Sequence, residues 1–380
     1  MKKFTTVAML AVAGLSLVLS SCGTPTYEIA LITDVGDIDD KSFNQGAWEG
    51  VVDFAEENNK TYEYYRPTAI GTDPYLAAIE LAVENGAEVI VTPGFLFETP
   101  IFFAQDDFED TSFILLDGVP NDGNWGGANG PEFRTEDNVM SILYAEEQAG
   151  FLAGYAAVME GYRSLGFMGG MAVPAVVRFG IGFAQGANVA ATELSLGADA
   201  ISLKYHYTGD FAATTKNRTT ADTMFQQDVE VIFAAGGAVG QSVMAAAEAT
   251  IDTDPNTIDG KVIGVDINQG GDSDTVITSA LKGLGASVQQ ALAEYFDGEF
   301  RGGETVVFNA SNDGVGLPTD EESFRFEEFT IAQYNAIFAK LANGTVTVNN
   351  SLTLGSTAND NAGLIAFGLD LAKVAITVVA

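Results

Sequence analysis

Histidine and cysteine are almost absent from this sequence. Its 380 residues include one cysteine, Cys22, and one histidine, His206. A single histidine excludes His-rich zinc sites, and a Ser-His-Asp triad would have to use His206 itself. Because His206 falls within an apolar, strand-like run, we interpret it as a structural residue. We therefore exclude zinc and catalytic sites that are built on several histidines.

Basic residues are also scarce. The chain has 17 Lys and Arg against 52 Asp and Glu, which gives a formal net charge of −35 at pH 7. A groove for the phosphates of DNA or RNA needs clustered Lys or Arg, so we exclude nucleic acid polymers as ligands. Solubility or a saline habitat explains the acidity itself more simply than an acidic function does.

Nucleotide-binding motifs are missing too. No GxGxxG follows the first expected strand, and there is no P-loop. Residues 234–243, AAGGAVGQSV, are a glycine-rich strand-to-helix turn without the Gly-Lys-Ser/Thr ending of a P-loop. We interpret this turn, which contains Gly237, as a tight turn beside a ligand.

The N-terminus carries a long apolar run. After a basic start, residues 7–19 are apolar but too few to span a bilayer securely, and the following LSSC is similar to the lipobox of bacterial lipoproteins. We predict a cleaved signal peptide (1–21) and a lipidated tether (22–27) that begins at diacylated Cys22. The body would be anchored on the extracytoplasmic side of the cell membrane, with about 0.8 kcal/mol contributed by each buried methylene.

Beyond the tether, buried-looking strands alternate with amphipathic segments of helix length, which predicts α/β architecture with parallel sheets. A polar break at residues 128–138 suggests that a first sheet is complete there. We expect two doubly wound lobes, formed by residues 28–138 plus about 266–302 and by residues 139–265 plus about 303–380. The seven clearest strand candidates are residues 28–33, 87–93, 112–119, 164–170, 200–207, 229–237 and 261–267.

The stretch DKSFNQG offers a candidate binding site. Ser42 and Gln45 have the spacing of a capping box, which places Phe43 and Asn44 in the first turn of a helix. Phe43 can be read as the first residue of that helix's apolar face or as a ring that faces a ligand. Ligands of open α/β sheets bind beyond the carboxyl ends of the strands, which favours the second interpretation.

Aspartates follow several of the expected strands, at Asp34, Asp117 and Asp266. An ionised carboxylate accepts two hydrogen bonds and can bridge neighbouring hydroxyls, which suits a neutral, hydroxyl-rich ligand. Each of these residues could instead cap the helix that follows it.

The sequence resembles the basic membrane protein family of lipoproteins. The resemblance runs from about residue 28 to 349 and is carried, in order, by LITDVGDIDDKSFNQGAWEG, VTPGFLFETPI, FILLDGV, EEQAGFLAGYAA, VIFAAGGAVGQSV, VIGVDIN and VITSALKGLGASVQQAL. It implies a type I periplasmic-binding-protein fold, in which two Rossmann-like lobes are joined by a hinge. It also implies a purine nucleoside ligand and delivery of that ligand to an ABC permease by a monomer whose lobes close on it. On this resemblance we expect no enzyme, and no metal or cofactor site.

The resemblance also assigns roles to residues. Phe43 is similar to one of two rings that stack on the purine, Asn44 to its polar neighbour, and Phe211, in YTGDFAATTK, is the candidate for the second ring. In the same way, Asp34 and Asp266 look like ribose ligands, Asp117 like the carboxylate that reads the base, and Lys282 like a sugar contact. A carboxylate suits the N1–H of guanine or hypoxanthine, so we expect guanosine and inosine in preference to adenosine.

Three alternatives remain open at this point. A nucleoside hydrolase would use Asp34, Asp39 and Asp40 to bind a metal, with a positioned water. The same fold could bind a sugar or a furanone signal, for which we expect one aromatic ring and more Arg and Asn contacts. A surface adhesin would retain its partner after Phe43→Ala.

Overall fold

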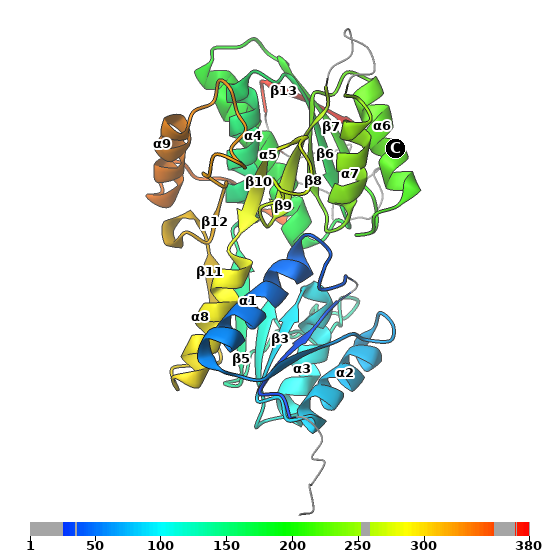
Figure 1. Cartoon of the computed structure of the whole chain (residues 1–380), viewed down its shortest axis with the longest axis vertical. Helices are drawn as coiled ribbons and strands as arrows, with labels where there is room; N and C mark the ends of the chain where they lie inside the picture. Colours follow the sequence, from blue (N-terminus) through cyan, green and yellow to red (C-terminus); the bar gives the residue numbers. More distant parts are fainter. Residues whose placement is uncertain (1–25, 35, 252–258, 353–368, 370, 380) are drawn as a thin grey trace, which may run out of the picture.

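The computed structural model describes residues 26–34, 36–251, 259–352, 369 and 371–379. The chain forms two lobes arranged along the long axis of the molecule, each with a central sheet and helices on both of its faces (Figure 1). The expected signal peptide, Cys22 and most of the tether lie outside the described residues. Within those residues, no helix is long and apolar enough to cross a membrane.

The first lobe is built on a six-stranded parallel sheet with the order β11-β5-β4-β3-β1-β2. Its strands are β1 (Ile29–Ile32), β2 (Tyr62–Tyr65), β3 (Val89–Pro93), β4 (Ser112–Leu116), β5 (Val139–Tyr144) and β11 (Thr305–Phe308). Its helices are α1 (Phe43–Asn58), α2 (Thr72–Glu84), the 3-10 turn η1 (Phe95–Phe97), α3 (Glu98–Asp107) and α8 (Leu284–Phe296).

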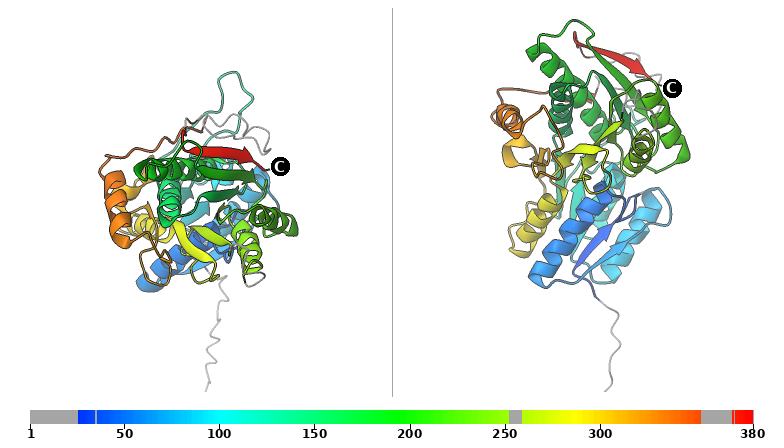
Figure 2. Two further views of the ribbon diagram at one scale, coloured as in Figure 1. Left: turned by 90° about the horizontal axis from the view of Figure 1, so that it is seen from above. Right: turned by 45° about the horizontal axis from the view of Figure 1, so that its top comes forward.

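The second lobe has a seven-stranded sheet with the order β12-β10-β9-β8-β6-β7-β13. Its strands are β6 (Ser164–Gly169), β7 (Ile201–Tyr207), β8 (Val231–Ala235), β9 (Lys261–Asp266), β10 (Val276–Lys282), β12 (Val315–Gly316) and β13 (Val374–Val378). Its helices are α4 (Glu146–Glu160), α5 (Pro174–Glu193), α6 (Thr215–Gln226), α7 (Val239–Glu248), the 3-10 turn η2 (Ala310–Asn312) and α9 (Ile331–Ala342). Figure 2 shows β13, in red, along the edge of this sheet.

The two lobes repeat one strand order. The orders β5-β4-β3-β1-β2 and β10-β9-β8-β6-β7 are the same arrangement, with each strand number raised by five. This doubly wound order places a topological switch point between β1 and β3 in the first lobe and between β6 and β8 in the second. Strands such as β1, β3 and β8 are buried along their whole length, because helices cover both faces of the sheet. The α/β fold with two parallel-stranded lobes is confirmed.

Strand pairing corrects the expected lobe boundaries. Residues 139–144 form β5, which pairs with β4 and so belongs to the first sheet, as does β11 at residues 305–308. Residues 276–282 form β10, which pairs with β9 in the second sheet. The polar stretch 128–138 lies within the β4–β5 connection and does not separate the lobes. Over the described residues, the chain therefore crosses between the sheets three times, after β5, after β10 and after β11.

Helices α4 and α5 pack with their backbones almost in contact. A Cβ atom on Gly150 would lie 2.1 Å from the carbonyl oxygen of Phe179, and one on Gly182 would lie 2.1 Å from that of Glu147. Only glycine therefore fits at these two positions. This close approach fixes the first turn of α5, which borders the space between the lobes.

Candidate ligand-binding site

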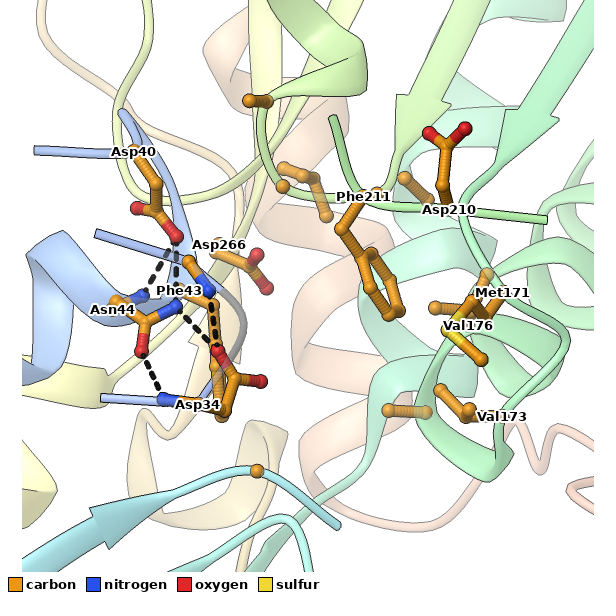
Figure 3. A pocket seen from close by; sticks show the side chains of 18 of the residues that line it. Asp34, Asp40, Phe43, Asn44, Met171, Val173, Val176, Asp210, Phe211 and Asp266 are labelled. Carbon is orange, nitrogen blue, oxygen red and sulfur yellow. Dashed lines mark hydrogen bonds between the residues drawn. The ribbon is translucent and has the colours of Figure 1, made fainter. Parts of the chain in front are cut away.

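A cavity of about 800 Å³ lies between the two lobes, and residues of both lobes line it (Figure 3). This volume lies within the range that is common for small-molecule sites, roughly 300–1,000 Å³. The structure brings all eight residues of the predicted ligand site to the cavity: Asp34, Phe43, Asn44, Asp117, Phe211, Gly237, Asp266 and Lys282.

The start of α1 positions Phe43 and Asn44, but not through the expected capping box. The carboxylate of Asp40 accepts hydrogen bonds from the backbone N–H groups of Ser42 (2.9 Å), Asn44 (3.1 Å) and Gln45 (3.1 Å). The Ser42 side chain makes no capping bond to the helix. Asp40 competes successfully because it lies close enough to reach three amides with two ionised oxygens. The predicted capping box is wrong, while the predicted helix start is right.

The segment that precedes α1 is also attached to the second lobe. The hydroxyl of Ser42 donates to Oδ2 of Asp266 at 2.5 Å. The buried side-chain amide of Gln269 donates to the backbone carbonyl of Lys41 at 2.5 Å. The helix that carries Phe43 is therefore fixed to both lobes in this conformation.

Asn44 is buried, and its side chain orients the carboxylate of Asp34. Its amide nitrogen donates to Oδ1 of Asp34 and to Oδ2 of Asp40, both at 3.0 Å, and its oxygen accepts from the backbone N–H of Asp34 at 3.4 Å (Figure 3). Both amide donors of Asn44 are thus engaged within the protein. The geometry favours Asn44 as a residue that positions Asp34.

The rings of Phe43 and Phe211 lie on opposite sides of the cavity, one from each lobe (Figure 3). Phe211 lies in the loop after β7, and two glycines make room for it. A Cβ atom on Gly170 would lie 2.5 Å from the ring of Phe211, and Gly237, with φ +55°, approaches the backbone of Phe211. The glycine-rich turn around Gly237 thus supports the second ring.

Asp117 and Asp266 end equivalent strands and share an unusual backbone conformation. Asp117 directly follows β4, and Asp266 is the last residue of β9. Their φ angles are +57° and +66°, in the left-handed region that non-glycine residues seldom adopt. Such strained positions cluster at functional sites, and here both carboxylates reach the cavity.

Lys282 lies at the crossing after β10, where its side chain is 2% exposed. Its ammonium pairs with Oδ2 of Asp117 and, at 3.2 Å, with Oε1 of Glu146, and it lies 4.9 Å from the centre of the Phe43 ring. The other oxygen of Asp117, Oδ1, is buried and accepts no hydrogen bond from the described part of the chain. A buried acceptor without a partner is costly, so a ligand donor that reached this oxygen would be favoured.

The charges in this cluster shift one another's pKa values. Burial raises the pKa of Asp117 and of Asp266 above the ordinary range, although the ammonium of Lys282 opposes the shift. Burial alone would lower the pKa of Lys282, but the carboxylates of Asp117, Glu146 and Asp266 outweigh it and raise the pKa. Lys282 is therefore charged at every physiological pH.

Sequence reasoning missed two residues of the site, Glu146 and Asp40. Glu146 is 1% exposed and lies at the start of α4, where the chain enters the second lobe after β5. It forms an ion pair with Lys282, which lies where the chain leaves that lobe after β10. It follows an apolar strand, as Asp34 and Asp117 do, so the same strand-end signal would have found it. Asp40 was considered only as a metal ligand. Within the described residues, no group of three or more His, Cys, Asp and Glu side chains could hold a metal ion.

Comparison with known proteins supports one family. The family model for PnrA-like ABC transporter substrate-binding proteins, Bmp, matches residues 28–351. The ABC transporter nucleoside-binding protein BmpA of Lactococcus lactis is 29% identical over 79% of this chain and 83% of its own length. A lipoprotein of Pyrococcus furiosus is 27% identical over 80% of this chain and 72% of its own length.

A solved structure agrees on the fold. The solute-binding protein of an ABC transporter system from Aeropyrum pernix K1 superposes with a TM-score of 0.67 at 24% identity, covering 85% of this chain and 87% of its own. Members of the matched family bind substrates for a permease and are not enzymes. The chain belongs to the Bmp family of PnrA-like ABC transporter substrate-binding proteins.

Proposed function

We propose that this substrate-binding protein captures purine nucleosides between its lobes and delivers them to its ABC permease. The observation that carries the proposal is the pair of opposed rings, Phe43 and Phe211, on either side of a cavity with carboxylates at its strand ends. A purine is flat and aromatic, whereas its ribose is rich in hydroxyls. The cavity offers a surface suited to each part.

Stacking would supply much of the affinity. Each base–aromatic contact contributes about 1–3 kcal/mol, and a micromolar dissociation constant requires about 8 kcal/mol. Phe43 is held by the first turn of α1 and by the neighbouring ammonium of Lys282. A ring that is fixed before binding loses little conformational entropy when the base arrives.

The carboxylates would provide selectivity. Oδ1 of Asp117 is a buried acceptor, which suits the N1–H of guanine or hypoxanthine. Adenine presents an acceptor at N1, so it would need another alignment. Guanosine and inosine are therefore the expected ligands ahead of adenosine, with Asp34 and Asp266 accepting from the ribose hydroxyls.

Two of the named relatives support parts of this proposal. BmpA of Lactococcus lactis is named for nucleoside binding, and the Pyrococcus furiosus relative is a lipoprotein. The lipobox-like LSSC suits an anchor at Cys22, which would hold the body at the outer surface of the cell membrane beside the permease. A sugar-binding site is less well supported, because no arginine is among the described residues that line the cavity and four phenylalanines are.

Isothermal titration calorimetry tests the proposal. The full-length lipoprotein in detergent, freed of carried-over ligand, is titrated with inosine, guanosine, adenosine, cytidine and ribose. We expect micromolar or tighter binding of purine nucleosides, and binding that is about 5- to 150-fold weaker in Phe43→Ala. Phe133→Ala is the matched control, because Phe133 is 53% exposed and does not line the cavity. Binding of ribose alone, or of none of these compounds to folded protein, would contradict the proposal.

A further inference from the structure

The cavity has a strongly one-sided charge. Among the described residues that line it there are seven aspartates, one lysine, and no arginine or histidine. The lysine, Lys282, is already paired with Asp117 and Glu146. A ligand that carries negative charge would thus meet an excess of carboxylates and no uncommitted cation in the described lining. The seven aspartates are Asp34, Asp37, Asp39, Asp40, Asp117, Asp210 and Asp266.

The N-terminus of α1 points its first amides toward this cavity. Such a terminus ordinarily binds phosphate, because its free N–H groups and the helix dipole both attract an anion. In this protein the carboxylate of Asp40 already accepts from the N–H groups of Asn44 and Gln45, and from that of Ser42 just before the helix. The protein's own carboxylate therefore occupies the place that a phosphate would take.

The α-helices α5 and α7 also begin at the cavity. Helix α5 starts with Pro174, which has no N–H, and its first turn lines the cavity with apolar side chains. At the start of α7, the N–H of Ala238 donates to the carbonyl of Phe211 at 3.1 Å, and that of Val239 donates to the carbonyl of Gly236 at 3.1 Å. At the start of α7 these amides are used within the protein, and at the start of α5 the first amide is absent.

We infer that the cavity rejects phosphate monoesters, with Asp40 as the residue that determines this specificity by filling the N-terminus of α1. The inference rests on the proposed nucleoside function and sharpens it, because nucleotides share the base and the ribose of nucleosides. A phosphate group would have to displace a carboxylate that is part of the helix cap. It would also lie among like charges in a partly desolvated space, which is strongly unfavourable.

The inference places the protein after a particular class of reaction. Where nucleotides are the source of nucleosides, a phosphate-monoester hydrolysis must come first. In that step water adds to phosphorus, the bond between phosphorus and the ester oxygen breaks, and the nucleoside leaves with a proton on that oxygen while inorganic phosphate is released. The protein captures the uncharged product and leaves the phosphate behind.

The test compares inosine with inosine 5′-monophosphate by calorimetry on the full-length lipoprotein. We expect the monophosphate to bind at least about 100-fold more weakly than inosine. Asp40→Asn removes the charge at the helix N-terminus and should narrow this ratio by about tenfold or more. The matched control is Asp39→Asn, which removes one charge from the same lining. Asp39 is exposed and screened by salt, so the ratio should change by less than about threefold.

The outcomes separate the inference from the function on which it rests. Binding of inosine but not of its monophosphate, with a larger effect of Asp40→Asn than of Asp39→Asn, supports the inference. Equal binding of both compounds overturns it and leaves nucleoside capture intact. Equal effects of the two variants overturn the role of Asp40. Binding of neither compound overturns the proposed function, and the inference with it. The readout is the ratio of the affinities for inosine and its monophosphate, measured on the same sample. A smaller fraction of folded variant affects both affinities equally and leaves their ratio unchanged.

Discussion

The two lobes share one strand order, yet they present opposite chemistry at their switch points. Between β1 and β3 of the first lobe, the carboxylate of Asp34 lies against Gly94. Between β6 and β8 of the second, Gly170 lies against Gly236, and a Cβ on Gly236 would come 2.5 Å from the backbone nitrogen of Gly170. Topology therefore determines where the strand ends meet, and sequence determines what they offer a ligand.

Part of each wall of the cavity shows the same contrast, although Phe43 belongs to the first wall and Asp210 and Asp266 to the second. Asp34, Asp40 and Asn44 form a hydrogen-bonded group on the wall of the first lobe (Figure 3). The facing wall presents Phe211 and apolar side chains at the start of α5 and just before it, such as Val176. A ligand with one polar part and one flat apolar part would be oriented by this difference alone. The residues that join the walls, Lys282 above all, belong to the chain crossings.

The largest effect is expected where the walls join. Lys282→Met removes the ammonium that balances Asp117, Glu146 and Asp266, and it leaves buried carboxylates without a counterion. Removing one partner of a buried ion pair costs about 3–5 kcal/mol. We expect the free energy of unfolding to fall by that amount, measured by urea denaturation at pH 8.

Lys340→Met provides the matched control for that experiment. Lys340 lies on α9 in a loose ion pair with Glu193, in which both side chains are more than 40% exposed. Its replacement should change stability by less than about 0.5 kcal/mol. Equal effects at the two positions would show that the buried cluster does not join the lobes.

The two rings test whether both walls contribute to stacking. Phe43→Ala and Phe211→Ala should each weaken inosine binding by about 5- to 150-fold, which corresponds to about 1–3 kcal/mol. Phe43 belongs to a capped helix and Phe211 to a loop, so we expect the larger loss at Phe43. Calorimetry on both variants measures the two losses. If Phe211→Ala has no effect, the second wall contributes shape but no stacking.

Asp117→Asn should lower the affinity by a similar or smaller factor than the two ring variants do. The effect should be confined to ligands with an N1–H. Hydrogen bonds to charged groups contribute about 1.5–3 kcal/mol, so guanosine should bind about 10- to 100-fold more weakly while adenosine changes little. Asp110→Asn is the control, since Asp110 is exposed near the opposite end of the same strand, β4. Equal losses for guanosine and adenosine would mean that Asp117 does not read the base.

Much of the fold was predictable because parallel sheets bury their strands completely. The runs at residues 87–93 and 229–237 are largely apolar, and both contain central strands. Lobe membership was not predictable in the same way. The apolar sequence of β5 or β10 indicates a strand, but it does not say which of two similar sheets the strand joins. That choice depends on pairing partners far away in the sequence.

The site, like the fold, was predictable only in part. Asp34, Asp117 and Asp266 could be located because strand ends share one edge of a sheet, and the structure places all three at the cavity. The hydrogen-bond partners of these residues could not be predicted from the sequence. The link from Ser42 to Asp266 joins residues 224 positions apart, and no local pattern indicates that Asp40 caps α1 in place of Ser42. Local motifs suggest which groups are available, whereas tertiary contacts decide how they are used.

The smallest effect concerns Glu147, a carboxylate of the second lobe whose Oε1 accepts one long hydrogen bond, from the side-chain amide of Asn350 at 3.4 Å. Glu147 is buried on α4, and its Oε2 accepts no hydrogen bond from the described residues. Burial, followed by the charge of Glu146, raises the pKa of Glu147 to about 7 from an ordinary 4.5. The folded state therefore binds this proton more tightly than the unfolded state, and stability falls as the pH rises through that window.

Glu147→Gln should remove this dependence on pH. At pH 4 the wild-type carboxyl is mostly protonated in both the folded and the unfolded state, so the variant should match the wild type in free energy of unfolding. At pH 8 the wild type buries a charge, and the variant should be more stable by at least about 1 kcal/mol. Urea denaturation at both pH values measures the difference, with Glu57→Gln on the exposed face of α1 as control. A variant less stable than the wild type at pH 8 would show that Glu147 has a partner that stabilises its charge.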